Sequence, residues 1–436
     1  MPQEDQILEQ EFPDAQEPEV TPRYRSYVLF ILTLVYVFNF VDRQILVVLQ
    51  ESIKKDLGLS DLQLGLMTGA AFAIFYVTVG LPIARWADRA NRKNIIALSL
   101  TIWSFFTVLS GRVANFTQML LARIGVGVGE AGGSPPAHSI ITDYYPPHKR
   151  ATALGIYSSG IYIGVLVGYL GGGIINNAVG WRTTFMVVGI PGILLALILY
   201  FTVKEPIRGR FEGGVKSEVG FMEVVRFLLS RPTFVWMALA TGFHTFVLYG
   251  TGNFFISFLE RVHGMTTLNA SIALALLSGL FGALGTYFGG RLSDKLAQKD
   301  KRWYLWYPVL SIVISLPFAP LIYFLDNTTL ALVFYIVPVF LLPSYLGPCV
   351  SVTHAMVKPN MRTFASAVLF FVLNLIGLGL GPVFAGGLSD YLAPSLGPAE
   401  ALRWSLFITT MVGIIGLWMF WKASKTLRED LERAPS

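Results

Sequence analysis

The stretch ILLALILYFTV (193–203) decides the fold class, because it is an almost unbroken run of apolar residues without alternation. A strand of a transmembrane β-barrel would alternate apolar and polar side chains over about ten residues. An α-helix instead crosses the hydrocarbon core of a bilayer with about 20 mostly apolar residues. The stretch therefore predicts a membrane-spanning helix in an all-α membrane protein.

Similar apolar stretches recur along the whole chain of 436 residues. Hydrophobic residues make up 54% of the chain and charged residues only 14%, whereas soluble domains carry about a quarter charged residues. The pattern predicts twelve transmembrane helices, near residues 27–50, 61–84, 95–112, 116–142, 151–177, 181–203, 231–258, 268–290, 304–325, 328–357, 363–391 and 399–422.

Polar segments divide these helices into two groups of six. The longest interruption, residues 205–230, is rich in glycine and charge, and we expect it to be a cytoplasmic linker. It separates an N-terminal bundle at 24–204 from a C-terminal bundle at 231–424. The acidic tail at 1–23 lacks the features of a cleaved signal peptide, so we expect it to be disordered and cytoplasmic. We also expect the tail at 425–436 to be cytoplasmic.

The positive charges predict the orientation. With the N-terminus in the cytoplasm, 25 of the 33 Lys and Arg residues fall in cytoplasmic segments, 6 in outer loops and 2 in the membrane. Cytoplasmic loops of membrane proteins carry such an excess. This distribution explains the net charge of +6 without a nucleic-acid partner. We expect a multi-pass protein of a bacterial inner membrane, with both termini in the cytoplasm.

Landmarks recur between the two groups of helices. The loop after helix 2 and the loop after helix 8 share a pattern that places Asp88 against Asp294. Arg150, at the start of helix 5, corresponds to Arg362, at the start of helix 11. The two offsets are 206 and 212 residues and thus nearly equal. The sequence therefore predicts two pseudo-symmetric bundles.

The loop GLPIARWADRANRK (80–93) resembles the loop motif of the major facilitator superfamily, although Ala90 and Asn91 stand where the family has a glycine. GGRLSDKLAQKDKR (289–302) repeats the motif more weakly. FNFVDRQILVVL (38–49) and ARIGVGVGEAGGSPPAHSIITDYYP (122–146) are similar to the spinster branch of that superfamily. The resemblance covers nearly the whole chain after residue 24, and it implies the major facilitator fold and secondary transport.

Four charged residues lie inside predicted helices 1 and 4, namely Asp42, Arg43, Arg123 and Glu130. Charges near the bilayer centre are costly, so these residues are the first functional candidates. We favour Glu130 as the proton carrier, because it is the deeper carboxylate and its glycine-rich helix continues into two prolines. The alternative is a set of structural ion pairs between the two helices. The spinster resemblance implies roles in proton coupling and in binding a substrate head group.

The C-terminal bundle contributes aromatic and uncharged polar residues to the predicted substrate site. Arginine binds phosphate or carboxylate through two parallel hydrogen bonds, and a charged half facing an aromatic half suits an amphiphile. For any single phenylalanine, packing or lipid contact is the better explanation. The predicted substrate-binding residues are Arg43, Arg123, Glu130, Phe243, His244, Tyr249, Asn253 and Asn374.

Charged residues at the cytoplasmic helix ends are predicted to form a gate. Carboxylates there can pair with arginines or with helix N-termini and thereby favour one state of a rocking transporter. In the superfamily that the chain resembles, these loops act as latches. The predicted gating residues are Arg85, Asp88, Arg89, Arg150, Arg291, Asp294 and Arg362.

Predicted helix 5 carries a glycine ridge, formed by Gly160, Gly164, Gly168 and Gly172 at four-residue spacing. Glycines on one face let helices approach closely, so the ridge predicts tight packing within the chain. A dimerisation face is the alternative.

The sequence contains no enzyme motif. Its one cysteine, Cys349, excludes a disulfide framework, and there is no metal-ligand spacing, P-loop or nucleophile elbow, so no metal or cofactor is expected. The expected partners are membrane lipids, protons and an amphiphilic small molecule, and the protein is expected to be a monomer. We predict proton-coupled transport of lysophospholipid- or sphingoid-type amphiphiles by alternating access. Alternatives are transport of sugars, organic acids or drugs, an uncoupled lipid facilitator or scramblase, a channel, or a sensor.

Overall fold

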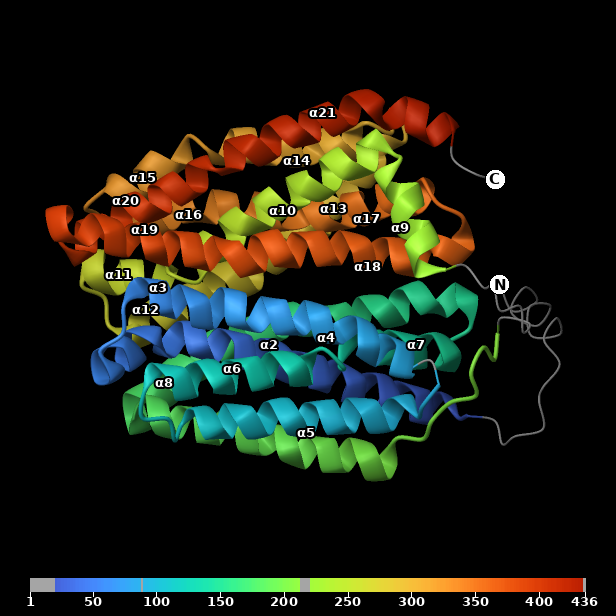
Figure 1. Cartoon of the computed structure of the whole chain (residues 1–436), viewed down its shortest axis with the longest axis horizontal. Helices are drawn as coiled ribbons and strands as arrows, with labels where there is room; N and C mark the ends of the chain where they lie inside the picture. Colours follow the sequence, from blue (N-terminus) through green and yellow to red (C-terminus); the bar gives the residue numbers. More distant parts are fainter. Residues whose placement is uncertain (1–19, 88, 212–219, 434–436) are drawn as a thin grey trace.

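The computed structural model describes residues 20–87, 89–211 and 220–433, and this part of the chain contains helices and no strands. Most helices run along one direction, and the first described helix begins on the same side of the molecule on which the last one ends (Figure 1). We call this the termini side. The other side, where Leu57 and Asp61 lie, is called the opposite side. The predicted all-α fold is confirmed.

The first half of the chain forms the lower group of helices in Figure 1. Its first helix is capped by Thr21, whose hydroxyl accepts the N–H of Tyr24, and Pro22 occupies the first helical position. The elements of this half are α2 (Pro22–Leu57), α3 (Asp61–Gly65), η1 (Leu66–Ala70), α4 (Ala71–Ala87), α5 (Arg92–Ser110), α6 (Phe116–Glu130), α7 (Ser134–Tyr144) and α8 (Pro147–Thr202).

The second half forms the upper group, and several of its helices are interrupted. Its elements are α9 (Phe221–Leu229), α10 (Pro232–Gly252), α11 (Phe255–His263), α12 (Thr267–Leu274), η2 (Ala275–Phe281), α13 (Gly282–Ala297), α14 (Trp303–Ser315), α15 (Phe318–Phe324), α16 (Thr328–Leu341), η3 (Leu342–Tyr345), α17 (Leu346–Ala355), η4 (Pro359–Met361), α18 (Arg362–Leu373), η5 (Asn374–Leu380), α19 (Gly381–Leu396), α20 (Pro398–Met411) and α21 (Gly413–Glu432).

The long apolar helices bear on the twelve predicted spans. Nine helices of the described part are long and apolar enough to cross a membrane, or ten when the bent pair α14 and α15 counts as one span. Helix α8 holds two of the predicted spans, and α6 with α7 covers the predicted span at 116–142. The described helices are therefore consistent with twelve crossings.

Two glycines make equivalent turns in the two halves. Gly180 turns α8 back on itself with φ 77° and ψ 166°, and Gly397 separates α19 from α20 with φ 79° and ψ 160°. Glycine adopts this region without the steric cost that a Cβ would bring. The repeated backbone geometry agrees with the predicted pseudo-symmetry.

The glycine ridge of α8 packs against α2. A Cβ added at Gly164 would lie 2.6 Å from the carbonyl oxygen of Val37, and one added at Gly168 would lie 3.2 Å from the Cα of Val41. The two helices thus touch through their backbones, which only glycine permits at this distance. The predicted close packing within the chain is confirmed.

The polar segments contain more helix than expected. Within the predicted linker, α9 buries Val224 and Leu228 in the core of the second half, because residues four apart share one helix face. Helix α21 continues through most of the predicted C-terminal tail to Glu432. Most of the predicted N-terminal tail, residues 1–19, lies outside the described residues.

Candidate functional site

The four charged residues predicted from helices 1 and 4 meet in one buried cluster. Asp42 and Arg43 come from α2, whereas Arg123 and Glu130 come from α6. The Nε of Arg43 donates to the Oε2 of Glu130 at 2.7 Å. Asp42 interacts electrostatically with both Arg123 and Glu130. The cluster holds two positive and two negative groups, and so its formal charge is zero.

Several polar atoms of this cluster have no hydrogen-bond partner among the described residues. They are Oδ1 of Asp42, Oε1 of Glu130, Oδ1 of the neighbouring Asn39, and Nε and Nη1 of Arg123. The residues that carry them are buried, with 1–4% of their surface exposed. Burying polar atoms without partners is costly, so a cluster with several of them has the capacity to bind further groups.

Aromatic rings surround Arg43. Its guanidinium lies 5.1 Å from the ring centre of Phe40, 4.7 Å from that of Phe72 and 5.2 Å from that of Tyr76. Tyr249, which comes from α10 in the second half, interacts electrostatically with the same guanidinium. Cation–π contacts stabilise a desolvated arginine by about 2 kcal/mol or more. Arg43 is thus held where the two halves meet.

Glu130 is the last residue of its helix. The backbone leaves the regular helix at 131–133, and α7 begins at Ser134 with Pro135 and Pro136 in its first turn. Proline lacks the N–H that would continue the hydrogen bonds of α6, which explains why the helix is broken at this point. The proposed proton carrier therefore lies next to a break in its own helix.

The predicted substrate residues of the second half do not all meet. Tyr249 faces the charged cluster, but the Nε2 of His244 bonds the carbonyl of Leu342 at 2.9 Å, inside the second half. The side chain of Asn374 donates to the carbonyl of Phe370 in its own helix. Phe243 is half-buried beside Phe246, and Asn253 lies toward the opposite side, where its carbonyl accepts from Gln50. Only Tyr249 is brought to the cluster.

The predicted gating residues lie at helix ends on the termini side. Arg150 donates to the carbonyls of Thr142 and Tyr145, and Arg291 donates to the hydroxyl of Tyr287. Asp88 lies outside the described residues. The remaining four are exposed, namely Arg85, Arg89, Asp294 and Arg362. Among the described members of the set, no ion pair joins the two halves.

A second cluster of charged residues joins the halves on the opposite side. The sequence did not predict it. Arg261 of α11 donates to Glu51 at 2.5 Å and to Asp61 at 2.7 Å, and Lys54 also contacts Asp61 at 2.5 Å. We call these four residues the Arg261 cluster. Its charged residues lie near helix ends, where charged residues are common and do not stand out in the sequence. Ser60 and Gln63 mark the start of α3 as a capping box, but no local pattern pairs it with Arg261.

Further hydrogen bonds join the halves beside the Arg261 cluster. The carboxylate of Asp390 accepts the backbone N–H of Asp61 at 2.9 Å and that of Leu62 at 2.7 Å. The side-chain amide of Gln50 donates to the carbonyl of Asn253 and to the hydroxyl of Ser257, both at 2.7 Å. Charge-assisted and buried hydrogen bonds of this kind are among the strong ones.

The contact between the halves is therefore asymmetric. Near mid-membrane, the hydroxyls of Tyr162 and Thr286 form a hydrogen bond and Arg43 interacts with Tyr249, whereas the other hydrogen bonds between described residues of the two halves lie toward the opposite side. From Tyr162 to the termini side, no hydrogen bond or ion pair between described residues joins them. The polar contacts between described residues of the two halves therefore lie at mid-membrane and on the opposite side.

Comparisons with known proteins agree with this architecture. The model of the Major Facilitator Superfamily matches residues 32–378. A solved bacterial homolog to the human lysosomal transporter Spinster, inward-facing and unoccupied, has a TM-score of 0.86 and 37% identity over 94% of this chain and 99% of its own. An MFS-type efflux pump of Mycolicibacterium smegmatis is 32% identical over 94% of this chain and 95% of its own. Protein spinster homolog 1 of Xenopus tropicalis is 27% identical over 94% of this chain and 83% of its own. This chain belongs to the major facilitator superfamily, in its spinster branch, and is a transporter rather than an enzyme.

Proposed function

We propose that this protein is a proton-coupled transporter of amphiphilic, lipid-like molecules that works by alternating access. The observation that carries the proposal is the buried charged cluster of Asp42, Arg43, Arg123 and Glu130, with its unpartnered oxygens and nitrogens. Carboxylate oxygens without partners can accept a proton, and arginine nitrogens without partners can bind an anionic group.

Glu130 is the proposed proton carrier. In this state its Oε2 accepts a hydrogen bond from Arg43, while its Oε1 has no partner among the described residues. A proton on Glu130 removes the charge that holds Arg43, and so Arg43 becomes available for a substrate. The interruption of the helix after Glu130 allows its carboxylate to move relative to α2. The Glu130 carboxylate and the anionic head group of a substrate then compete for the same guanidinium, so protonation of Glu130 favours substrate binding.

The substrate class follows from the surroundings of Arg43. An anionic head group, such as a phosphate or carboxylate, would bind between Arg43 and Arg123. The rings of Phe40, Phe72 and Tyr76 would contact its apolar part. A lysophospholipid- or sphingoid-type molecule has this combination of head and tail. Sugars, organic acids or drugs are the second class.

The asymmetric contact between the halves supports an inward-facing state. The excess of Lys and Arg on the termini side favours the cytoplasm for that side. Polar contacts close the opposite side, so the charged cluster would be reached from the cytoplasm in this state. We propose that the loops that carry Arg85 and Arg89 in the first half and Asp294 in the second half pair across the halves in the outward-facing state.

The experiment is uptake of a fluorescent lysophospholipid into proteoliposomes, with and without an imposed pH gradient. Wild type is compared with Glu130→Gln, which keeps the size of the side chain and removes its charge. The control is Asp56→Asn, an exposed carboxylate that pairs with Arg182 within the first half. We expect the gradient to increase wild-type and control uptake, and Glu130→Gln to abolish that increase.

Other outcomes would contradict parts of the proposal. Uptake that ignores both the gradient and Glu130 would indicate a facilitator or scramblase. Absence of lysophospholipid uptake, together with gradient-driven uptake of a sugar acid or drug, would overturn the substrate class and keep the coupling. Equal loss in Asp56→Asn would show that the effect of Glu130→Gln is not specific.

A further inference from the structure

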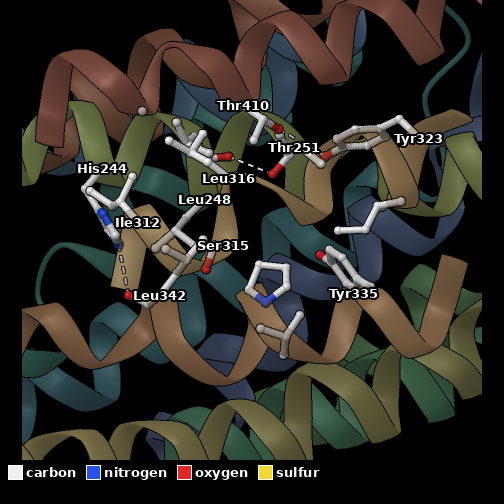
Figure 2. Close-up of a pocket in the computed structure, with 16 residues that line it drawn as sticks. His244, Leu248, Thr251, Ile312, Ser315, Leu316, Tyr323, Tyr335, Leu342 and Thr410 are labelled. Carbon is white, nitrogen blue, oxygen red and sulfur yellow. Dashed lines mark hydrogen bonds between the residues drawn. The ribbon is translucent and has the colours of Figure 1, made fainter. Parts of the chain in front are cut away.

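A cavity of about 80 Å³ lies inside the second half, away from the contact between the halves. It is lined by α10, α14, α15, α16, α20 and α21 (Figure 2). Its wall on α10 extends from His244 to Thr251, which is about 10 Å along a helix. A water molecule needs roughly 10–15 Å³ in this measure, so the cavity has room for several such groups.

The wall is mainly apolar, and several of its polar groups are satisfied by hydrogen bonds within the second half. Thr251 donates to the carbonyl of Val247, Thr410 donates to that of Leu406, and His244 bonds that of Leu342. The hydroxyl of Ser315 is buried and has no hydrogen-bond partner in the described part of the chain. Figure 2 shows it pointing into the space between the lining residues. A buried, unpartnered hydroxyl in an apolar chamber fits a ligand that has an apolar chain and a hydroxyl group.

Four helices are interrupted around this cavity. Helix α10 ends next to Thr251, the bent pair α14 and α15 breaks by 43° after Ser315, Pro338 lies within α16, and α21 begins at Gly413. All four of these residues line the cavity. Interrupted helices cannot pack as regular ridges into grooves, which explains why space remains here. Whatever fills the cavity contacts all four breaks.

Helix α10 separates this cavity from the charged cluster. Leu248 lines the cavity, whereas the next residue, Tyr249, interacts with Arg43 on the other face of the helix. Adjacent residues on a helix point about 100° apart, so the two sites lie on different sides of α10. The cavity is therefore distinct from the proposed site of the head group and the proton.

We propose that this cavity is a second ligand site, which binds a medium-chain aliphatic alcohol through a hydrogen bond to Ser315. The apolar wall receives the carbon chain, and the Ser315 hydroxyl both donates to and accepts from the alcohol. Because the ligand contacts the breaks of four helices, its binding stiffens the second half. The site is independent of the proposed transport function.

The test is photolabelling of the full chain in lipid nanodiscs with a diazirine analogue of 1-octanol, followed by peptide mapping. We expect labelling in the segments 315–323 and 335–342, with competition by unlabelled 1-octanol. Ser315→Ala removes only the oxygen, and it should weaken competition by 1-octanol about 3- to 10-fold, the value of one hydrogen bond. Competition by n-octane should not change in that variant.

Two further variants make the test specific. Ser315→Leu places carbon in the cavity and should reduce labelling at least about 5-fold, whereas Val313→Leu, on the exposed face of the same helix, should not. If Ser315→Leu fails to fold, the Ser315→Ala comparison decides alone. Absence of labelling in both segments, which means that the cavity holds water or nothing, would overturn the proposal. Equal competition by 1-octanol in wild type and in Ser315→Ala would also overturn the proposal.

Discussion

The two sides of the contact between the halves differ in the kind of force that acts there. On the opposite side, Arg261 holds Glu51 and Asp61, and Asp390 caps a helix of the other half. On the termini side, no polar contact between described residues joins the halves. Separating a buried ion pair is strongly destabilising, because it leaves a buried charge without its partner. Such pairs therefore hold the two halves together in one state. The state of the molecule is therefore set by a few charged residues on the closed side.

The largest effect is expected for Arg261→Ala. It leaves Glu51 and Asp61 without their arginine, and breaking a buried ion pair costs about 3–5 kcal/mol. The closed state is weakened, so the opposite side should open more often. The reporter is Ser271→Cys, because Ser271 is buried against Gly173 of the other half and its hydroxyl has no partner among the described residues. Maleimide labelling of this cysteine should become at least about 100-fold faster.

The matched control for this prediction is Arg182→Ala. Arg182 also pairs with a carboxylate on the opposite side, Asp56, but both belong to the first half and are exposed. Such pairs contribute at most about 1 kcal/mol, so the labelling rate should stay almost the same. The native Cys349 is fully buried and should give little background. Equal rates in Arg261→Ala and Arg182→Ala would contradict the role of the Arg261 cluster.

Gln50→Leu should have the next largest effect. The variant keeps the bulk of the side chain but leaves the carbonyl of Asn253 and the hydroxyl of Ser257 without a donor. An unsatisfied buried group costs about 1–3 kcal/mol. Labelling of the same reporter should therefore rise about 5- to 50-fold, which is less than in Arg261→Ala. The double variant with Arg261→Ala would show whether the two contacts act together. A rate equal to wild type would exclude Gln50 from the closure.

Asp390→Ala should have a smaller effect. It removes the acceptor for the N–H groups of Asp61 and Leu62, although Ser60 still caps the same helix through its own side chain. Loss of a helix cap costs about 0.5–2 kcal/mol. The labelling rate should rise only a few-fold, and Asp390→Asn should recover part of the loss. A larger effect than that of Arg261→Ala would reverse the expected order.

The smallest effect is expected on the termini side, within the second half. Arg302 and Arg428 bond Asp300 and hold the pKa of its carboxylate well below the usual range. A carboxylate with a lowered pKa stabilises the folded protein above its unfolded pKa of about 4, and that contribution is lost as the pH falls. Asp300→Asn should lower the melting temperature by only about 1–2 °C at pH 7. The difference should shrink below about pH 4, and the labelling rate of the reporter should not change.

The sequence was sufficient for the fold and for the charged cluster, for clear physical reasons. Apolar runs and the distribution of Lys and Arg are dictated by the bilayer, and charges such as Asp42 and Glu130 stand out inside apolar spans. The Arg261 cluster was not predictable, because it joins residues about 200 positions apart whose charges look like those of any loop. The direction of His244 was missed as well, since a helix without charged residues does not reveal which face is turned inward.

The glycine ridge of α8 has a mechanical consequence. Backbone contact between α2 and α8 leaves little free volume, so the first half should move as a rigid body. The second half instead contains a cavity surrounded by interrupted helices and should deform more easily. A rocking movement would therefore bend the second half before the first. Amide hydrogen exchange would detect this as faster exchange in α14 to α16 than in α2 and α8.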